Sequence, residues 1–539
     1  MCKRRIIVFN NIKQPINASV EEAFSVARKK LLSLTGCGTS ELFLYRRSID
    51  ARKKDCILFV YSVGAELWDC KISEERLKKI DAQIISVEEP KVSVGESILS
   101  APPVIVGSGP CGLFCALLLA EWGYAPVLLE RGSSVSLRKK AVEAFYSEHI
   151  LDIDSNIQFG AGGAGTFSDG KLVTRVNDPL CNYVLHRFVE FGAPADIEFI
   201  AKPHVGTDIL SEVVDKILQR ISELGGKVYY NTKFISANET LGKVNSVKTS
   251  RGELPCGVLV LAIGHSARDT YGELLSKSMN IEGKSFSVGM RIEHKAHDID
   301  KAMFGDFAGH PSLGHAEYNL SHDTKNRGVY TFCMCPGGEV VAAASEQGGV
   351  VVNGMSYHAR ASENSNSAVV CSVFKEDYGS SAPLAIDFQR KIERAAFACT
   401  GGDFNAPIIT VGDFLSGQIK NQPHRITPSY MNGSNVVIRS PEEYLPDFVC
   451  NAIKGALHNF DNKIHGFACS DAVLTGAETR TSAPLRIIRD PDTRIATGYT
   501  NLYPAGEGAG YAGGITSAAI DGLKTAISII GKYKPIISR

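Results

Sequence analysis

The stretch that decides the fold is Pro103-Val-Ile-Val-Gly-Ser-Gly-Pro-Cys-Gly112. Its apolar start is typical of a buried parallel strand, and the glycines at 107, 109 and 112 follow in the spacing G-x-G-x-x-G. Gly107 permits a tight turn, Gly109 lets a phosphate approach the backbone, and Gly112 allows the next helix to pack closely on the strand. The stretch therefore predicts a strand, a phosphate-binding turn and a helix.

The residues that follow complete a β-α-β unit. An apolar helix is expected over 113–122 and a second strand over 125–129, which ends at Glu130 and Arg131. Glu130 lies 18 residues after Gly112, where dinucleotide-binding folds carry the carboxylate that binds a ribose. A pyrophosphate would then bind at the helix N-terminus. A glycine-rich turn without a ligand is the alternative, but it does not require the strand, helix and acid in this order.

The composition excludes several classes of protein. The 58 basic and 58 acidic residues cancel, so no overall field attracts nucleic acid or an anionic membrane. No apolar stretch approaches the ~20 residues of a membrane helix, and no signal-peptide core precedes the first strand-like run, so a cytoplasmic protein is expected. The 14 cysteines are scattered without a C-x-x-C pair, which predicts reduced thiols rather than a disulfide framework or a structural metal site.

The first 95 residues predict a separate domain. Strands are expected over 4–9, 42–45, 56–62 and 83–87, and helices over 19–34 and 73–80. This β-α-β-β-α-β order is the ferredoxin-like pattern. Residues 88–102, which contain Pro90 and Pro102 and precede Pro103, are expected to link this domain to the dinucleotide-binding unit.

A charged segment, Arg46-Arg-Ser-Ile-Asp-Ala-Arg-Lys-Lys54, joins two of these strands. Its five positive charges and one acid could contact RNA or a protein partner. A solvated hairpin is the more common structure for such a run, and we expect a hairpin here.

A second glycine-rich segment covers residues 156–171, Asn-Ile-Gln-Phe-Gly-Ala-Gly-Gly-Ala-Gly-Thr-Phe-Ser-Asp-Gly-Lys. Much of its backbone is free of side chains, which suits close contact with a large ligand. Thr166, Ser168 and Lys171 add two hydroxyl groups and a cation. The alternative is a flexible surface loop, which fits less well with a position between two parts of one cofactor fold.

The rest of the chain continues the α/β pattern. Helices are expected over 207–224, 384–400 and 446–464, and strands over 227–234, 243–250 and 257–263. Residues 280–425 are rich in strand-like segments. Among them, residues 328–345 predict a hairpin with Pro336-Gly337-Gly338 at its turn.

The segment Leu502-Tyr-Pro-Ala-Gly-Glu507-Gly-Ala-Gly-Tyr-Ala-Gly-Gly514 is the second anchor of the expected cofactor site. A strand ends at an acid, glycines follow, and a helix of small residues begins near Ile515. The positive end of such a helix stabilises negative charge, including the charge that develops on a reduced flavin ring.

Together these segments resemble the FAD-binding flavoproteins of the glutathione-reductase structural type. The closer resemblance, over nearly the whole chain, is to the bacterial NAD(FAD)-utilizing dehydrogenases. It rests on 156–171, Lys202-Pro-His-Val-Gly-Thr-Asp208, Ala262-Ile-Gly-His-Ser-Ala-Arg-Asp-Thr270, Phe332-Cys-Met-Cys-Pro-Gly-Gly338, Gly476-Ala-Glu-Thr-Arg480 and Gly506-Glu-Gly-Ala-Gly-Tyr-Ala-Gly-Gly514.

This resemblance implies an α/β protein with three parts. A Rossmann-like three-layer FAD-binding domain would cover 96–279 and 491–539. A β-rich substrate or cap domain would be inserted at 280–490, and a ferredoxin-like α+β domain would cover 1–95.

The resemblance also implies non-covalent FAD as the cofactor. Gly107–Gly112 and Glu130 would hold the pyrophosphate and the adenosine ribose, and the Phe234 backbone would meet the adenine. Glu507 would meet the pyrophosphate–ribityl segment, and Gly514–Ile515 the pyrimidine edge of the flavin. The cofactor-binding residues expected in all are Gly107, Ser108, Gly109, Pro110, Cys111, Gly112, Glu130, Arg131, Gly163, Thr166, Ser168, Lys171, Phe234, Gly264, Gly506, Glu507, Gly514 and Ile515.

The sequence does not identify the catalytic residues, but four side chains are candidates: Cys335, His265, Arg268 and Arg480. Cys333 and Cys335, at i and i+2 of an expected strand, would face one side and could exchange electrons with a flavin. A C-x-C pair in a strand is also ordinary packing. His265 and Arg268 could reach a substrate, bind phosphate or cap a helix, and Arg480 could bind an anion.

The sequence therefore predicts a FAD-dependent oxidoreductase, a dehydrogenase, that acts on an unknown small-molecule substrate. The only dinucleotide fingerprint that we find is the one at 107–112, so NADH or NADPH is expected at most as a transient partner that docks over the flavin. Neither a membrane nor nucleic acid is expected as a partner. The alternative is a flavin-binding accessory or RNA-associated protein without turnover, in which the first domain makes the interaction.

Overall fold

The computed structural model describes residues 5–36, 41–67, 72–86, 90, 92–174, 176–324, 327–420 and 422–536. Residue 4, at the start of the strand expected over 4–9, and residue 87, at the end of the strand expected over 83–87, lie outside these ranges. Residues 88, 89 and 91 of the expected linker also lie outside them. Within the described ranges no helix combines the length and the apolar character needed to cross a bilayer. The chain is a mixed α/β protein with several sheets.

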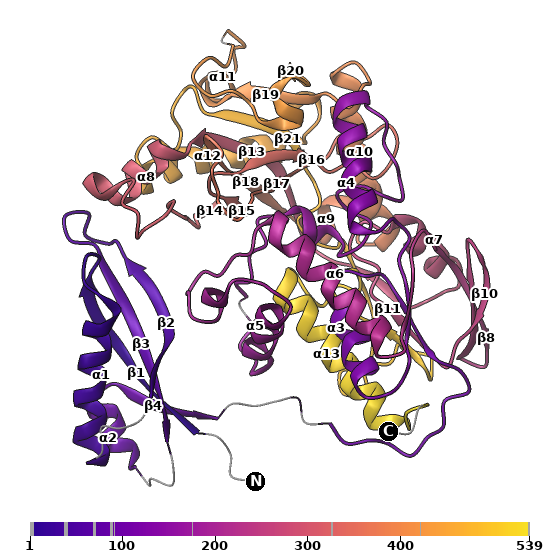
Figure 1. Cartoon of the computed structure of the whole chain (residues 1–539). Helices are drawn as coiled ribbons and strands as arrows, with labels where there is room; N and C mark the ends of the chain where they lie inside the picture. The colour runs from indigo at the N-terminus through magenta and orange to yellow at the C-terminus, as the bar shows by residue number, and fades with distance from the viewer. Residues whose placement is uncertain are drawn as a thin grey trace.

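The N-terminal sheet has the strand order β2-β3-β1-β4, with antiparallel neighbours throughout. Its elements are β1 (Arg5–Pro15), α1 (Val20–Thr35), β2 (Leu42–Asp50), β3 (Leu58–Leu67), α2 (Glu74–Lys79) and β4 (Ala82–Ser86). Ser19 caps α1 in a capping box with Glu22. The expected β-α-β-β-α-β order of elements is confirmed, and Figure 1 shows this unit to one side of the remaining chain.

The charged segment 46–54 differs from the expected hairpin loop. Its first five residues extend β2, because they pair with Ser62 to Leu58 of β3. Arg47 exchanges backbone hydrogen bonds with Phe199 and Ala201, and its guanidinium lies 5.8 Å from the centre of the Phe199 ring. Arg52 forms an ion pair with Asp50. Part of the positive charge is thus used inside the chain, which weakens the RNA-binding alternative.

The strand that begins the stretch 103–112 belongs to a five-stranded parallel sheet with the order β23-β11-β5-β6-β7. The strands are β5 (Pro103–Val106), β6 (Val127–Leu129), β7 (Lys227–Tyr229), β11 (Val258–Leu261) and β23 (Leu502–Pro504). The helix α3 (Pro110–Glu121) connects β5 to β6, as expected. A Cβ on Gly112 would lie 1.8 Å from the Gly107 carbonyl oxygen, so only glycine allows this helix to approach the turn.

The parallel sheet lies between two other layers. On one face Ile105 packs with the helices α3, α5 (Leu180–Glu190), α6 (Thr207–Glu223) and α13 (Ile515–Lys532). On the other face Val104 and Val106 pack with α7 (Arg268–Ser276) and with a small antiparallel sheet. That sheet contains β8 (Phe234–Thr240), β9 (Lys243–Thr249) and β10 (Gly252–Pro255). The single strand expected over 227–234 was wrong, because the chain turns at Asn231 and divides between two sheets.

The β-rich region has a seven-stranded sheet in the order β14-β15-β18-β13-β21-β19-β20. Its strands are β13 (Phe286–Lys295), β14 (Ser321–Thr324), β15 (Arg327–Cys335), β18 (Asn364–Val373), β19 (Ala406–Thr410), β20 (Val436–Ile438) and β21 (Val473–Glu478). Its helices are α8 (Ala296–Phe304), α9 (Lys375–Tyr378), α10 (Ala382–Cys399), α11 (Val411–Ser416) and α12 (Asp447–Lys463). The two long helices, α10 and α12, were expected from the sequence.

The polypeptide enters and leaves this region side by side, because β12 (Ile281–Gly283) pairs antiparallel with β22 (Leu485–Ile487). Figure 1 shows the region above the parallel sheet and the helices α3 and α13. The division into the ranges 1–95, 96–279, 280–490 and 491–539 stays a prediction.

The hairpin expected over 328–345 was wrong. β15 pairs with β14 and β18, whereas β16 (Glu339–Ala342) pairs with β17 (Val352–Met355). Between β15 and β16, the Gly338 N–H donates to the Asn364 carbonyl oxygen, and the Gly337 carbonyl oxygen accepts a hydrogen bond from the Ser362 N–H. Neither bond joins β15 to β16. The Pro-Gly-Gly sequence therefore moves the chain to a different sheet.

Candidate functional site

A cavity of about 310 Å³ lies at the carboxyl ends of the parallel strands β5, β11 and β23. Its other wall comes from the β-rich region, through Phe332, Cys333, Asn353, Glu478, Arg480 and Thr481. In open parallel sheets, ligands bind at this edge, and a pocket between two structural regions is a common place for a cofactor.

The cavity brings together most of the residues expected from the sequence. The predicted residues that line it are Gly107, Gly109, Pro110, Cys111, Gly163, Ser168, Lys171, Gly264, His265, Arg480, Glu507, Gly514 and Ile515. They come from five segments that are far apart in sequence. The predicted residues outside the lining are Ser108, Gly112, Glu130, Arg131, Thr166, Phe234, Gly506, Arg268 and Cys335.

Two helices begin at the cavity with free N-termini. The N-cap residues are Gly109 for α3 and Gly514 for α13, and neither provides a side-chain cap or is followed by an acid in the first turn. The exposed N–H groups and the positive end of each dipole favour an anion. A Cβ on Gly109 would have only Gly163 Cα nearby, at 3.9 Å, so the backbone here is open to a ligand. These features fit a pyrophosphate at α3 and an anionic ring edge at α13.

The glycine-rich segment 156–171 forms a wall of the cavity and is held in place by hydrogen bonds, unlike a flexible surface loop. The fully buried Arg138 of α4 (Val135–Glu148) donates hydrogen bonds to the carbonyl groups of Asn156, Ile157, Ala161 and Gly163. One guanidinium thus fixes the path of the segment. Its long separation in sequence from the glycines explains why the sequence analysis missed it.

Glu130 has a task within the protein that the sequence did not predict. Its carboxylate accepts hydrogen bonds from the Ser108 N–H and hydroxyl groups and from the N–H groups of Gly132 and Gly160, at 2.6–3.1 Å. Glu130 therefore ties the phosphate turn to the glycine-rich segment, and its expected contact with the ribose stays a prediction.

Four further residues that were predicted to bind the cofactor lie outside the cavity lining and already have partners within the protein. Arg131 pairs with Asp154 and Asp269. The Thr166 carbonyl accepts a hydrogen bond from Thr207 at 2.5 Å, and the Thr166 side chain is buried away from the cavity lining. The Gly506 N–H binds the Asp521 carboxylate at 2.7 Å. Phe234 packs in the core beneath the β8–β10 sheet. These contacts give the four residues structural roles, and their predicted contacts with the cofactor, including that of the Phe234 backbone, stay predictions.

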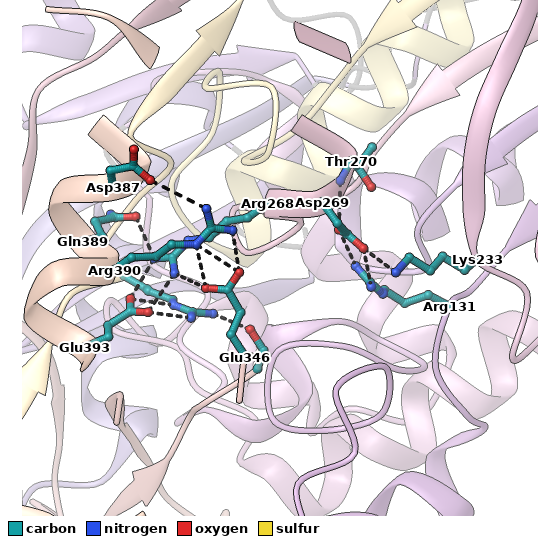
Figure 2. A network of polar contacts seen from close by, with 12 residues as sticks. Arg131, Lys233, Arg268, Asp269, Thr270, Glu346, Asp387, Gln389, Arg390 and Glu393 are labelled. Carbon is teal, nitrogen blue, oxygen red and sulfur yellow. Dashed lines mark hydrogen bonds and ion pairs between the residues drawn. The ribbon is translucent and has the colours of Figure 1, made fainter. Parts of the chain in front are cut away.

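Arg268 is held in a buried ion network (Figure 2). It is not among the residues that line the cavity. Its guanidinium donates to Glu393 and Glu346 at 2.7 Å and to Gln389 at 3.1 Å. Glu393 also accepts hydrogen bonds from Arg480, which does line the cavity. The network joins α7 to the β-rich region, and Arg480 is its member at the cavity.

His265 lines the cavity with an unpaired nitrogen. Its Nε2 atom is buried and has no hydrogen-bond partner among the described residues. Burial, helped by the nearby Arg480, lowers the pKa of His265 to about 4. The ring is therefore neutral near pH 7 and can accept or donate one hydrogen bond to a ligand.

The sequence analysis missed a buried pair beside the cavity, Glu478 and Arg291. Their closest charged atoms are 3.8 Å apart, and Glu478 Oε2 and Arg291 Nε have no hydrogen-bond partner among the described residues. Burial raises the pKa of Glu478 to about 7. A carboxyl group that exchanges its proton near neutral pH in a cavity is suited to acid–base work. The only signal in the sequence was an acid at the end of a buried strand.

Glu478→Gln is expected to remove part of the pH dependence of stability. Because the folded protein holds this proton more tightly than the unfolded chain, whose pKa is about 4.5, the wild type loses stability as the pH rises from about 4.5 to about 7. The loss is at most ~3 kcal/mol at about 1.4 kcal/mol per pKa unit. Melting midpoints from about pH 5 to about pH 8 should fall less for Glu478→Gln. The exposed Glu282→Gln is the control, and equal slopes in all three proteins would contradict the prediction.

Comparison with known proteins identifies the family. Over 528 residues the chain is 45% identical to an uncharacterised protein of Clostridium beijerinckii. The match covers 96% of this chain and 98% of that protein. The chain belongs to the family of that protein. Residues 285–481 also match the family described as "FAD-dependent protein, C-terminal domain-like". These residues are the β-rich region between β12 and β22. FAD is therefore the cofactor of this family member, in agreement with the prediction.

Two solved structures are more remote. L-amino acid deaminase from Proteus vulgaris is 14% identical, with 83% of this chain and 97% of that chain covered and a TM-score of 0.32. Glycine oxidase from Bacillus cereus is 10% identical, with 80% and 95% covered and a TM-score of 0.32. Scores this low establish neither a shared substrate nor a shared reaction. The glutathione-reductase type and the dehydrogenase family stay predictions.

Proposed function

We propose that this protein is a FAD-dependent oxidoreductase that binds FAD non-covalently in the cavity and oxidises or reduces a small molecule there. One observation carries the proposal: a single cavity joins the G-x-G-x-x-G turn and two uncapped helix N-termini to ionisable side chains from a separate sheet. The flavin would occupy the side of residues 96–279 and 491–539. The substrate would approach from residues 280–490.

The residues of the cavity divide into two groups by their chemistry. The N-termini of α3 and α13 would hold the pyrophosphate and the pyrimidine edge of the flavin. Lys171 adds a cation, held 3.3 Å from Asp169. Bound FAD supplies the electron or hydride transfer. Glu478 and Arg480 on the opposite wall, together with His265 after β11, would orient a polar substrate and accept or return its proton.

Reduction by nicotinamide is expected to be slow and weakly saturating. No second dinucleotide fingerprint with its β-α-β context was found in the sequence, so NADH or NADPH would have to dock briefly over the flavin. The dehydrogenase assignment belongs to this proposal. The measurement is anaerobic mixing with each nucleotide while the flavin absorbance is followed. Rapid bleaching that saturates at micromolar nucleotide would contradict the prediction and indicate a dedicated nicotinamide site.

The oxidoreductase proposal itself is tested by the same absorbance in a screen of small metabolites. At least one compound is expected to bleach the bound flavin, and oxygen or an artificial acceptor should restore it. Stoichiometric FAD that no reductant of this kind bleaches would instead favour the accessory-protein alternative.

A further inference from the structure

The segment Cys333-Met334-Cys335 at the end of β15 brings two thiols together at the cavity. A β-bulge lies between Phe332 and Cys335, and Cys333 has a φ of +45°. In this geometry the Cys335 thiol donates a hydrogen bond to the Cys333 carbonyl oxygen at 3.3 Å, and the two thiols lie close enough to interact with each other. Cys333 lines the cavity, whereas Cys335 is fully buried behind it. A strained, left-handed residue at a functional cavity is expected only where the surroundings maintain it.

Two cations hold this segment. Arg291, whose side chain has no exposed surface, donates from Nη2 to the Cys333 carbonyl oxygen at 2.5 Å. Lys171 donates to the Met334 carbonyl oxygen. Both positive charges lie close enough to act on the thiols, and thiolate formation next to Arg or Lys is the usual origin of a reactive cysteine.

The pKa values of the two thiols shift in opposite directions. The hydrogen bond from Cys335, then Arg291 and Lys171, lower the pKa of Cys333 against the opposing effect of burial. The same hydrogen bond and burial raise the pKa of Cys335. Cys111 is a useful contrast, because it also lines the cavity but burial raises its pKa well above the usual range. The cavity therefore has one thiol that favours the thiolate form and one that does not.

We propose that Cys333 and Cys335 form a dithiol–disulfide pair that exchanges two electrons with the flavin. This rests on the proposed function, since it requires FAD in the cavity. In the oxidative direction the Cys335 S–H bond breaks and one S–S bond forms between the Cys333 thiolate and the Cys335 Sγ atom. Two electrons pass to FAD, and the single proton released by Cys335 passes to the reduced flavin, directly or by way of Glu478, whose Oε2 is unpaired beside this pair. The reverse step returns the two electrons and the proton, which restores the thiolate and the thiol.

The proposal is tested on the full-length holoprotein. The flavin is photoreduced without oxygen, the protein is quenched in acid and denatured, and free thiols are labelled with N-ethylmaleimide for peptide mass spectrometry. The peptide with residues 333–335 should carry an internal disulfide when the flavin is oxidised and two labels after reduction. Full reduction of the wild type should also take up twice as many electrons as that of Cys335→Ser.

The control is Cys399→Ser, at the end of α10, which should match the wild type. The labelling of wild-type protein requires no variant, so poor folding of Cys335→Ser leaves the test intact. Fully reduced flavin with unchanged labels at 333–335 and equal electron uptake would overturn the dithiol proposal and leave the proposed function standing. Protein without FAD would instead refute the proposed function.

Discussion

Gly109→Val is expected to yield a folded protein that carries no FAD. Gly109 has an ordinary φ of −69°, and a Cβ there would meet only Gly163 Cα at 3.9 Å. The protein itself therefore tolerates a side chain at this position. The valine methyl groups would project into the space expected for the pyrophosphate and would hold it away from the N–H groups of α3. Overfilling a site costs ~1–3 kcal/mol, so we expect the affinity for FAD to fall by about 5- to 150-fold.

The measurement is the flavin-to-protein absorbance ratio after gel filtration, with circular dichroism to verify folding. Gly272→Val is the matched control, because Gly272 lies exposed in α7 with no atom within 4 Å of its added Cβ. The control should stay yellow. If Gly109→Val retains one FAD per chain, the pyrophosphate does not bind at this turn, and the assignment of the cavity fails at its first step.

The phosphate turn could be predicted from the sequence because every part of its signal is local. The glycine spacing, the strand and the helix all lie within 103–122, and the close approach of Gly112 to Gly107 depends on the backbone alone. The helices α6, α10 and α12 were predictable for the same reason, since their apolar periodicity needs no distant partner.

The partners of charged residues could not be predicted, because they come from distant segments. Glu130 is satisfied by Gly160, and Arg268 by Glu393, 125 residues further along the chain. The same limit explains the error at Pro336-Gly337-Gly338, where the sequence indicates a turn but not the strand that the chain joins next. Local patterns predicted which residues gather at the cavity, whereas long-range pairing decides which of them remain free for a ligand.

Glu393→Gln is expected to cause the largest loss of stability among conservative substitutions in the ion network. The carboxylate accepts five hydrogen bonds at 2.7–3.1 Å, two from Arg268, two from Arg480 and one from Thr479. Glutamine keeps the shape but removes the charge, so two buried guanidinium groups would face each other with less compensation. Removing one partner of a buried pair costs about 3–5 kcal/mol. The measurement is urea or thermal unfolding of the holoprotein at pH 7.

Asp387→Asn on the same helix α10 is the matched control. Asp387 is largely exposed and lies 3.8 Å from Arg390 at the margin of the network (Figure 2), and exposed pairs contribute about 0–1 kcal/mol. The two arginines hold the pKa of Glu393 well below its usual range against the effect of burial. The wild type should therefore lose this stability as the pH falls below the ordinary glutamate pKa, whereas Glu393→Gln should show no such step. Similar melting of Glu393→Gln and Asp387→Asn would mean that the network does not stabilise the contact between α7 and the β-rich region. Arg480 would then have to be held at the cavity by Ser345 and packing alone.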